Sequence, residues 1–310
     1  MSNCILAFDF GGTKLAVGLV EAKQGAILRH YQEPTPQGGA DASLAIMLAW
    51  GQQLLKESVC PVIGAGVNFG GPVDARHGIV FQSHHVTGWN NRPLAHELAE
   101  KLHLPTVIDN DANGQALAEW RYGAGSGTRS FIFINLGTGL GGGIIIDGCL
   151  WSGAHGLAGE FGHFPIRPNG PLCSCGRRGC LEALCAGPAI QRRLVDALAQ
   201  EHSSVSLTLA ELWTAAETGV PIAKHVADAI FEDLAHGLAI IQLSFDPELI
   251  ALGGGAAAYT SSQFHDIQQQ ARSYVLPLAS PYLRVVRATL GAESGLLGAA
   301  AIFLNQTHND

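Results

Sequence analysis

The feature that most constrains the fold of this chain is an order of elements that occurs twice. In each copy an apolar strand runs into a glycine-rich turn, and a second apolar strand follows directly. The copies differ in residue sequence, so the repeat is one of architecture, and it predicts two related halves with a ligand between them. The first copy comprises Cys4–Phe10, 11–14 and 15–20, and the second comprises Phe131–Leu136, 137–143 and 144–147.

The glycine turns have the composition of phosphate-binding turns. Their backbone N–H groups are not hidden by bulky side chains, so they can surround phosphate oxygens with donors. Thr13 and Thr138 add hydroxyl donors at equivalent places, and Asp9 is placed to hold the water shell of a metal ion. Either turn alone is equally compatible with an ordinary hairpin. Two matched turns, with the glycine run 253–255 after a third strand, favour nucleotide binding.

Two common nucleotide motifs are excluded by their context. Residues 137–142 fit the pattern GxGxxG, but in a dinucleotide site that turn opens a helix. Here it precedes Ile144-Ile145-Ile146, which predicts a strand. The P-loop pattern GxxxxGK[ST] does not occur in the sequence.

Residues 107–113 contain the candidate catalytic group. The sequence Val-Ile-Asp-Asn-Asp-Ala-Asn predicts the end of a buried strand, a polar turn and a helix over residues 112–122. A carboxylate held at such a strand end can take a proton from a substrate hydroxyl, so Asp111 is the candidate general base. Alternatively Asp111 caps the helix, a role that is compatible with catalysis.

A cysteine cluster predicts a metal site. Four of the seven cysteines fall between Cys173 and Cys185, and His163 lies a short distance upstream. One histidine and three cysteines fit a closed structural zinc site, whereas the alternative is a group of buried free thiols. Cys185 is then the spare cysteine, a small core residue. The ligands would be His163, Cys173, Cys175 and Cys180.

Composition narrows the class of protein. With 310 residues, 47% of them hydrophobic, the chain can bury a large core and is expected to form two domains. The formal net charge of -8 argues against a nucleic-acid partner. The sequence shows neither an export signal nor a membrane span, so a cytoplasmic protein without a membrane partner is expected.

Several motifs resemble a known family. Asp9-Phe10-Gly11-Gly12-Thr13-Lys14, Asn110-Asp111 and the turn at 137–143 resemble the actin/hexokinase ATPase fold. Glu160-Phe161-Gly162-His163 and Cys173-Ser174-Cys175-Gly176-Arg177-Arg178-Gly179-Cys180-Leu181-Glu182 are similar to the ROK family (repressors, open reading frames, sugar kinases). The resemblance covers essentially the whole chain. It implies an α/β, ribonuclease H-like fold of two domains, with mixed sheets flanked by helices.

The resemblance also implies how the chain is divided and what it binds. The expected domains are a smaller one, 1–110 plus 295–310, and a larger one, 111–294, with a zinc-bearing loop at 160–185. The resemblance implies a homodimer that uses ATP, Mg²⁺ and a structural Zn²⁺. The expected sugar-binding residues are Gly71, Asn90, Asn110, Asp111, Glu160, His163 and Glu182. The expected nucleotide-binding residues are Asp9, Gly11, Gly12, Thr13, Lys14, Gly137, Thr138, Gly139 and Gly254.

The implied activity is ATP-dependent phosphorylation of the 6-hydroxyl of a hexose, glucose first. N-acetylmannosamine, N-acetylglucosamine and fructose remain alternative substrates. A further alternative is a non-catalytic sugar-sensing regulator, but regulators in the family carry a DNA-binding domain before the core. Because Asp9 follows the first residue closely, no such domain is expected here. Structural alternatives also exist for Glu160, as a solvated loop residue, and for Glu182, as a first-turn helix carboxylate.

Overall fold

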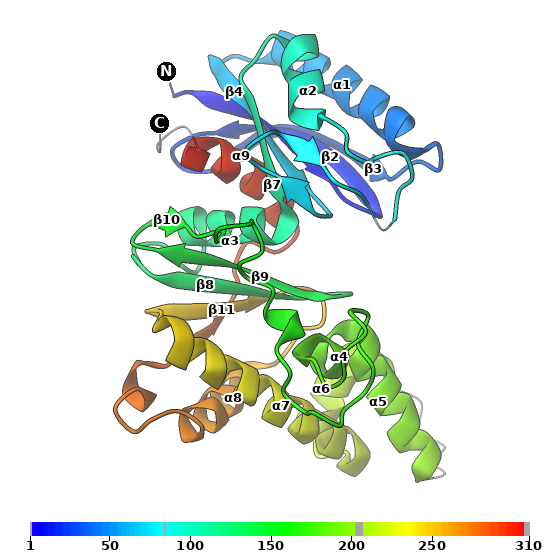
Figure 1. The fold of residues 1–310 in the computed structure, drawn as a ribbon, viewed down its shortest axis with the longest axis vertical. Helices are drawn as coiled ribbons and strands as arrows, with labels where there is room; N and C mark the ends of the chain where they lie inside the picture. The colour runs from blue at the N-terminus through cyan, green and yellow to red at the C-terminus, as the bar shows by residue number, and fades with distance from the viewer. Residues whose placement is uncertain (1, 84, 202–206, 307–310) are drawn as a thin grey trace. The chain divides into compact units, whose positions relative to one another are not determined.

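The computed structural model describes residues 2–83, 85–201 and 207–306 of the chain. It contains two five-stranded sheets whose central strands pair in the same way (Figure 1). In each sheet, the first strand of the predicted repeat pairs antiparallel with the second strand of that repeat. On its other side it pairs parallel with a strand from later in the chain, and that strand pairs parallel with one further strand. The predicted architectural repeat is therefore present in the fold.

The first sheet has the order β3-β2-β1-β4-β7 and the second has the order β10-β9-β8-β11-β12. The strands of the first are β1 (Cys4–Phe10), β2 (Lys14–Glu21), β3 (Ile27–Pro34), β4 (Val62–Phe69) and β7 (Thr106–Asn110). Those of the second are β8 (Phe131–Leu136), β9 (Leu140–Ile146), β10 (Cys149–Leu150), β11 (Leu249–Gly253) and β12 (Val285–Arg287). A small hairpin consists of β5 (Val73–Asp74) and β6 (Ile79–Val80).

Contacts divide the chain into two units, which comprise 1–127, 149–156 and 290–310, and 128–148 and 157–289. The first contains the helices α1 (Gly39–Glu57), α2 (Leu94–Leu102), α3 (Asp111–Tyr122) and α9 (Ser294–Gln306). The second contains α4 (Leu181–Cys185), α5 (Gly187–Gln200), α6 (Leu209–Glu217), α7 (Pro221–Phe245) and α8 (Ser261–Ser273). The boundaries of these two units differ from those of the predicted domains. The predicted division into domains stays a prediction.

In the first unit, β1 is covered on both faces. Leu6 and Phe8 belong to a core cluster with residues of α1 and α2, while Ile5 and Ala7 belong to another with residues of α9. Alternation along the strand sends neighbouring side chains to opposite faces, which explains why β1 is a nearly continuous apolar run. Asp9 shares the α9 face.

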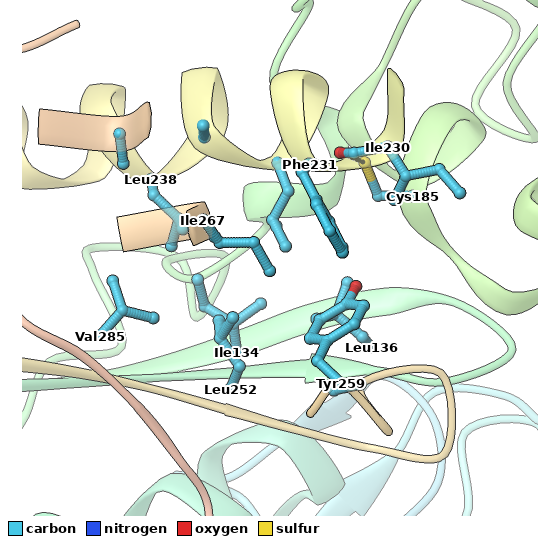
Figure 2. Packing of buried hydrophobic residues seen from close by; sticks show 14 of the residues in the cluster. Ile134, Leu136, Cys185, Ile230, Phe231, Leu238, Leu252, Tyr259, Ile267 and Val285 are labelled. Carbon is cyan, nitrogen blue, oxygen red and sulfur yellow. Dashed lines mark hydrogen bonds between the residues drawn. The ribbon is translucent and has the colours of Figure 1, made fainter. Parts of the chain in front are cut away.

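In the second unit, one large cluster joins the sheet to α7 and α8. Figure 2 shows Ile134 and Leu252 of the strands facing Leu238 of α7 and Ile267 of α8. The long helix α7 carries a stripe of apolar residues four positions apart, and all of them are buried. They are Ile222, Val226, Ile230, Leu234 and Leu238.

Two features of the structure, the length of the second glycine turn and a disulfide, were not predicted. The second glycine turn is shorter than predicted, because β9 begins at Leu140 and the glycines after it pair with β8. A disulfide joins Cys4 to Cys60, with 6.0 Å between their Cα atoms. Over the described residues, no helix has the length and apolar character needed to cross a membrane.

Candidate functional site

Three polar residues form a row across the ends of neighbouring parallel strands. Asp9 of β1 is opposite Asn68 of β4, and Asn68 is opposite Asp109 of β7. Asn68 is buried and donates from Nδ2 to Oδ1 of Asp9 at 2.8 Å. Burial is the largest influence on Asp9 and raises its pKa, partly offset by the Asn68 hydrogen bond and the Lys14 charge. The row therefore holds carboxyl groups where the strands end, a common place for ligand sites in α/β folds.

The turn after β7 is held by its own side chains. Asp109 accepts from the backbone N–H of Asn110 at 2.7 Å and from Nδ2 of Asn113 at 2.9 Å. Asn110 is the N-cap of α3, because its Oδ1 accepts from the N–H of Asn113 at 2.8 Å. The alternative that Asp111 caps this helix is therefore wrong: Asp111 is the first helical residue, and its carboxylate is left for other uses.

The carboxyl group of Asp111 has an unusual affinity for protons. Burial, and next the charge of Asp9, raise its pKa to about 6, while backbone N–H donors oppose the shift. A carboxylate with this pKa is mostly ionised at neutral pH yet binds a proton more strongly than an ordinary aspartate. Those are the properties required of a general base.

The first glycine turn lies beside this row. The N–H of Gly11 donates to the carbonyl of Lys14 at 3.0 Å, and the Thr35 hydroxyl donates to the carbonyl of Gly11 at 2.9 Å. A Cβ at Gly11 would lie 2.7 Å from the Lys14 oxygen, so close approach of the backbone requires glycine there. Thr13, the next hydroxyl of the predicted set, is exposed.

The other candidate residues of the first unit lie in loops. Gly71 follows β4 and donates to the carbonyl of Phe69 at 2.9 Å, whereas Asn90 is exposed in the loop before α2. A Cβ at Gly71 would lie 2.8 Å from the carbonyl oxygen of Gln82, so this loop too is closely packed.

The second glycine turn is enclosed by other backbone segments. Gly137 accepts from the N–H of Gly187 at 2.8 Å, and its own N–H donates to Gly139 at 3.0 Å. Gly254 has a φ of +90°, and a Cβ there would lie 2.4 Å from the carbonyl of Leu136. Positive φ and lack of space both require glycine at 254. Thr138, like Gly139, is exposed.

The cysteine cluster forms as predicted in the second unit. The ligand atoms of His163, Cys173, Cys175 and Cys180 all lie within 4.8 Å of one another. Sulfur ligands of a tetrahedral zinc with Zn–S of about 2.3 Å lie about 3.8 Å apart. The Sγ atoms of Cys175 and Cys180 are 3.7 Å apart, and Cys173 Sγ is 3.7 Å from His163 Nδ1. The donor set and its spacing therefore fit zinc.

The neighbouring acidic residues differ in their surroundings. Glu160 is exposed and places Oε2 3.8 Å from Nε2 of His163. Glu182, in the first turn of α4, accepts from the N–H of Leu140 at 3.0 Å and from the Ser174 hydroxyl at 3.0 Å. Cys185 lies outside the cluster, buried in α4.

The predicted site residues thus separate by unit. The first unit brings together Asp9, the turn at 11–14 and Asp111, and it also contains Gly71, Asn90 and Asn110. The second contains the turn at 137–139, Gly254, Glu160, Glu182 and the cysteine cluster.

Sequence inspection missed Asn68 and Asp109 as partners of the candidate residues. Both are polar residues at the end of an apolar strand, as Asp9 is, and that shared position was the available signal. Their pairing could not be read from the chain, because it depends on the register between strands that are far apart in sequence.

A profile of the ROK family matches residues 5–306. The chain belongs to the ROK family. Among proteins similar to this ROK chain, the glucokinase of Thermotoga maritima is 33% identical over 308 residues, which cover 96% of each chain. The N-acetylmannosamine kinase of Citrobacter koseri is 31% identical over 302 residues, covering 96% of this chain and 97% of its own.

A solved structure extends the similarity of this ROK chain to three dimensions. It is a ROK family glucokinase from Streptomyces griseus in complex with glucose and AMPPNP, and it matches with a TM-score of 0.78 and 31% identity. The match covers 98% of this chain and 99% of that one. The predicted ROK fold, a two-domain α/β ATPase fold, is thereby confirmed.

Proposed function

We propose that this ROK protein is an ATP-dependent hexose kinase that phosphorylates the 6-hydroxyl of glucose. The observation that carries the proposal is Asp111, a carboxylate with a pKa raised to about 6 at the strand-to-helix turn. Full-length similarity to a glucokinase, and to a glucokinase structure with glucose and a nucleotide analogue, supports the substrate class. Similarity to an N-acetylmannosamine kinase keeps that amino sugar as the alternative, with N-acetylglucosamine and fructose.

Phosphoryl transfer requires little covalent chemistry from a protein beyond alignment, a base for the attacking hydroxyl and stabilisation of phosphate charge. Asp111 accepts the proton of the sugar hydroxyl as the hydroxyl oxygen attacks the γ-phosphorus of ATP. The bond from that phosphorus to the β–γ bridging oxygen breaks, and ADP leaves. The Asn110 side chain is fixed by the N–H of Asn113 and leaves its amide N–H groups to donate to a neighbouring sugar oxygen.

The remaining sugar contacts are proposed from the resemblance. Carboxylates accept from adjacent hydroxyls, and imidazole nitrogens accept or donate, which suits a polyol. If Nδ1 of His163 faces the metal, its Nε2 is left for a hydroxyl. The proposed set is Gly71, Asn90, Asn110, Asp111, Glu160, His163 and Glu182.

The glycine turns are proposed to bind the nucleotide. In the second turn, the N–H groups of Thr138 and Gly139 have no protein acceptor among the described residues, so they are available to phosphate oxygens. Asp9 would hold Mg²⁺ through water, and its Oδ2 is not used by the Asn68 hydrogen bond. Bound Mg²⁺ neutralises phosphate charge. The proposed nucleotide set also includes Gly11, Gly12, Thr13, Lys14, Gly137 and Gly254.

A structural zinc is proposed for the cysteine cluster. His163, Cys173, Cys175 and Cys180 would hold it, and four-coordinate thiolate sites of this kind contribute directly to folding. With these four ligands, a bound zinc would connect the loop that carries Glu160 and His163 to the start of α4. The predicted homodimer and cytoplasmic location stay predictions.

The test is a coupled ADP-release assay across glucose, N-acetylmannosamine, N-acetylglucosamine and fructose with ATP and Mg²⁺. We expect turnover with glucose and assign the product by the phosphate position, which nuclear magnetic resonance reports. Turnover only with an amino sugar would replace the substrate and keep the kinase. Binding of a sugar with no phosphoryl transfer to any of the four would favour the sugar-sensing regulator instead.

A further inference from the structure

Glu182 contacts two segments that are far apart in sequence. Its Oε2 accepts from the backbone N–H of Leu140, the residue that ends the second glycine turn, at 3.0 Å. Its Oε1 accepts from the hydroxyl of Ser174, which lies between two cysteines of the cluster, at 3.0 Å. The carboxylate thus joins the cysteine loop to the glycine turn through both oxygens.

The surrounding packing leaves this link little freedom. A Cβ at Gly139 would lie 2.9 Å from Oε2 of Glu182, so the turn lies directly against the carboxylate. On the other side, a Cβ at Gly162 would lie 2.2 Å from the carbonyl oxygen of Leu140 and 3.3 Å from Cβ of Glu182. The N–H and the carbonyl of Leu140 are therefore both in close contact with the segment that contains the cluster.

The hydrogen bond from Leu140 to Glu182 also determines which backbone N–H groups of the turn remain available to a ligand. The N–H of Leu140 is used by Glu182, whereas those of Thr138 and Gly139 are not used by any protein acceptor in the described part of the chain. A hydrogen bond to a carboxylate is stronger and more directional than one between neutral groups. Fixing Leu140 in this way fixes the direction of the two N–H groups immediately before it.

From these contacts we propose that Ser174 is a positioning residue for nucleotide binding. Its hydroxyl orients Glu182, and Glu182 holds the turn at 137–139 in the shape that receives phosphate. The inference rests on the proposed role of that turn in the kinase. Glu182 then has two proposed functions. It contacts the sugar, and through its hydrogen bonds it connects the cysteine loop to the turn that binds the nucleotide.

The test compares Ser174→Ala with Ser174→Thr in the full chain, with zinc content measured for each. Ser262→Ala is the matched control, because Ser262 is also exposed and its hydroxyl donates to Glu217 at 2.6 Å, in a different part of the same unit. We expect Ser174→Ala to raise the KM for ATP, and the Kd of AMPPNP without sugar, about fivefold. The KM for glucose should rise by a smaller factor, because the six other residues of the proposed sugar set are untouched, and Ser174→Thr and Ser262→Ala should behave like the parent.

A further variant, Thr138→Val, tests separately whether the turn at 137–139 binds the nucleotide, the proposed function on which the role of Ser174 rests. If Thr138→Val weakens AMPPNP binding and Ser174→Ala does not, the turn binds nucleotide and the positioning role is wrong. If Thr138→Val leaves AMPPNP binding unchanged, the turn is not the nucleotide site and the inference fails with it. Loss of zinc from Ser174→Ala, or an increase only in the KM for glucose, would also overturn the role proposed for this hydroxyl.

Discussion

Asp111 owes its chemistry to the residues around it. Asn110 caps α3, Asp109 fixes the backbone of the turn, and Asp9 adds a negative charge nearby. The carboxylate of Asp111 is consequently held at the first helical residue without being used as the cap. Two experiments test the role of this residue. One replaces its carboxylate by an amide, and the other varies the pH across its pKa.

Asp111→Asn is expected to lower kcat by about 10²–10⁴, because a general base typically contributes that factor. Glucose affinity should change by less than about tenfold, since the amide keeps the shape and one acceptor of the carboxylate. Steady-state turnover and equilibrium sugar binding give the two numbers. Near-parental turnover would show that Asp111 is not the base.

The pH dependence follows from the raised pKa. Activity requires the ionised carboxylate, so kcat/KM should fall tenfold per pH unit below an apparent pKa of about 6. For stability the sign is opposite: ionisation of this half-buried carboxyl group destabilises the fold as pH rises through about 6, so Asp111→Asn should not lower Tm at pH 8. Rates from pH 5 to 8 and melting curves at pH 8 measure both. An acid limb near pH 4 would indicate an ordinary, solvated aspartate.

At the scale of elements, the two glycine turns need glycine at Gly12 and Gly139 for a reason other than positive φ. The positive-φ glycines include Gly254, but Gly12 and Gly139 are not among them. A side chain at either meets another side chain rather than backbone: that of His85 at Gly12 and that of Glu182 at Gly139. Glycine is therefore required there because a Cβ would crowd these neighbouring side chains, and not because of backbone strain.

Gly12→Val and Gly139→Val should each raise the KM for ATP by at least about tenfold, because a branched side chain occupies the space of a phosphate oxygen. Because neither position has positive φ, both variants should fold. Unchanged melting curves and zinc content are the control. Glucose binding without nucleotide should be retained after Gly12→Val, and its loss together with intact ATP binding would contradict the assignment of the turns.

The metal site gives a second prediction at this scale. Purified protein should contain one zinc per chain, and Cys175→Ser should lose it, because a closed site requires all four ligands. Cys149→Ser, which removes an exposed thiol that is not a member of the cluster, is the control and should retain the metal. Elemental analysis after gel filtration measures both. A full zinc content in Cys175→Ser would exclude that ligand.

How far the sequence predicted these elements depends on the range of the interactions involved. Strands, turns and helices follow from local patterns, and so does the cysteine cluster, whose ligands lie within about 20 residues. The cap at Asn110 was assigned to the wrong neighbour, because Asn and Asp cap equally well. The row of Asp9, Asn68 and Asp109 depends on strand register, which no local pattern specifies.

At the scale of the whole molecule, a disulfide joins the start of β1 to the segment before β4. The cysteines are 56 residues apart, so the bond removes much of the freedom of the unfolded chain. Cys60→Ser should therefore lower the free energy of unfolding by about 2–4 kcal/mol. Denaturant unfolding with and without dithiothreitol measures it, and Cys60→Ser should be insensitive to the reductant. An equal stability of parent and variant under non-reducing conditions would show that the bond does not stabilise the fold.

The helix α9 has a consequence for the order in which a ribosome can complete this fold. Its residues cover Ile5, Ala7 and Val20 in the first unit, although they are synthesised long after them. The first sheet must therefore leave the exit tunnel with one apolar face open, while residues 128–148 and 157–289 already form a complete unit of their own. The nascent chain therefore exposes an apolar sheet surface until α9 has been synthesised, so β1 and β2 are the strands that need protection from aggregation longest.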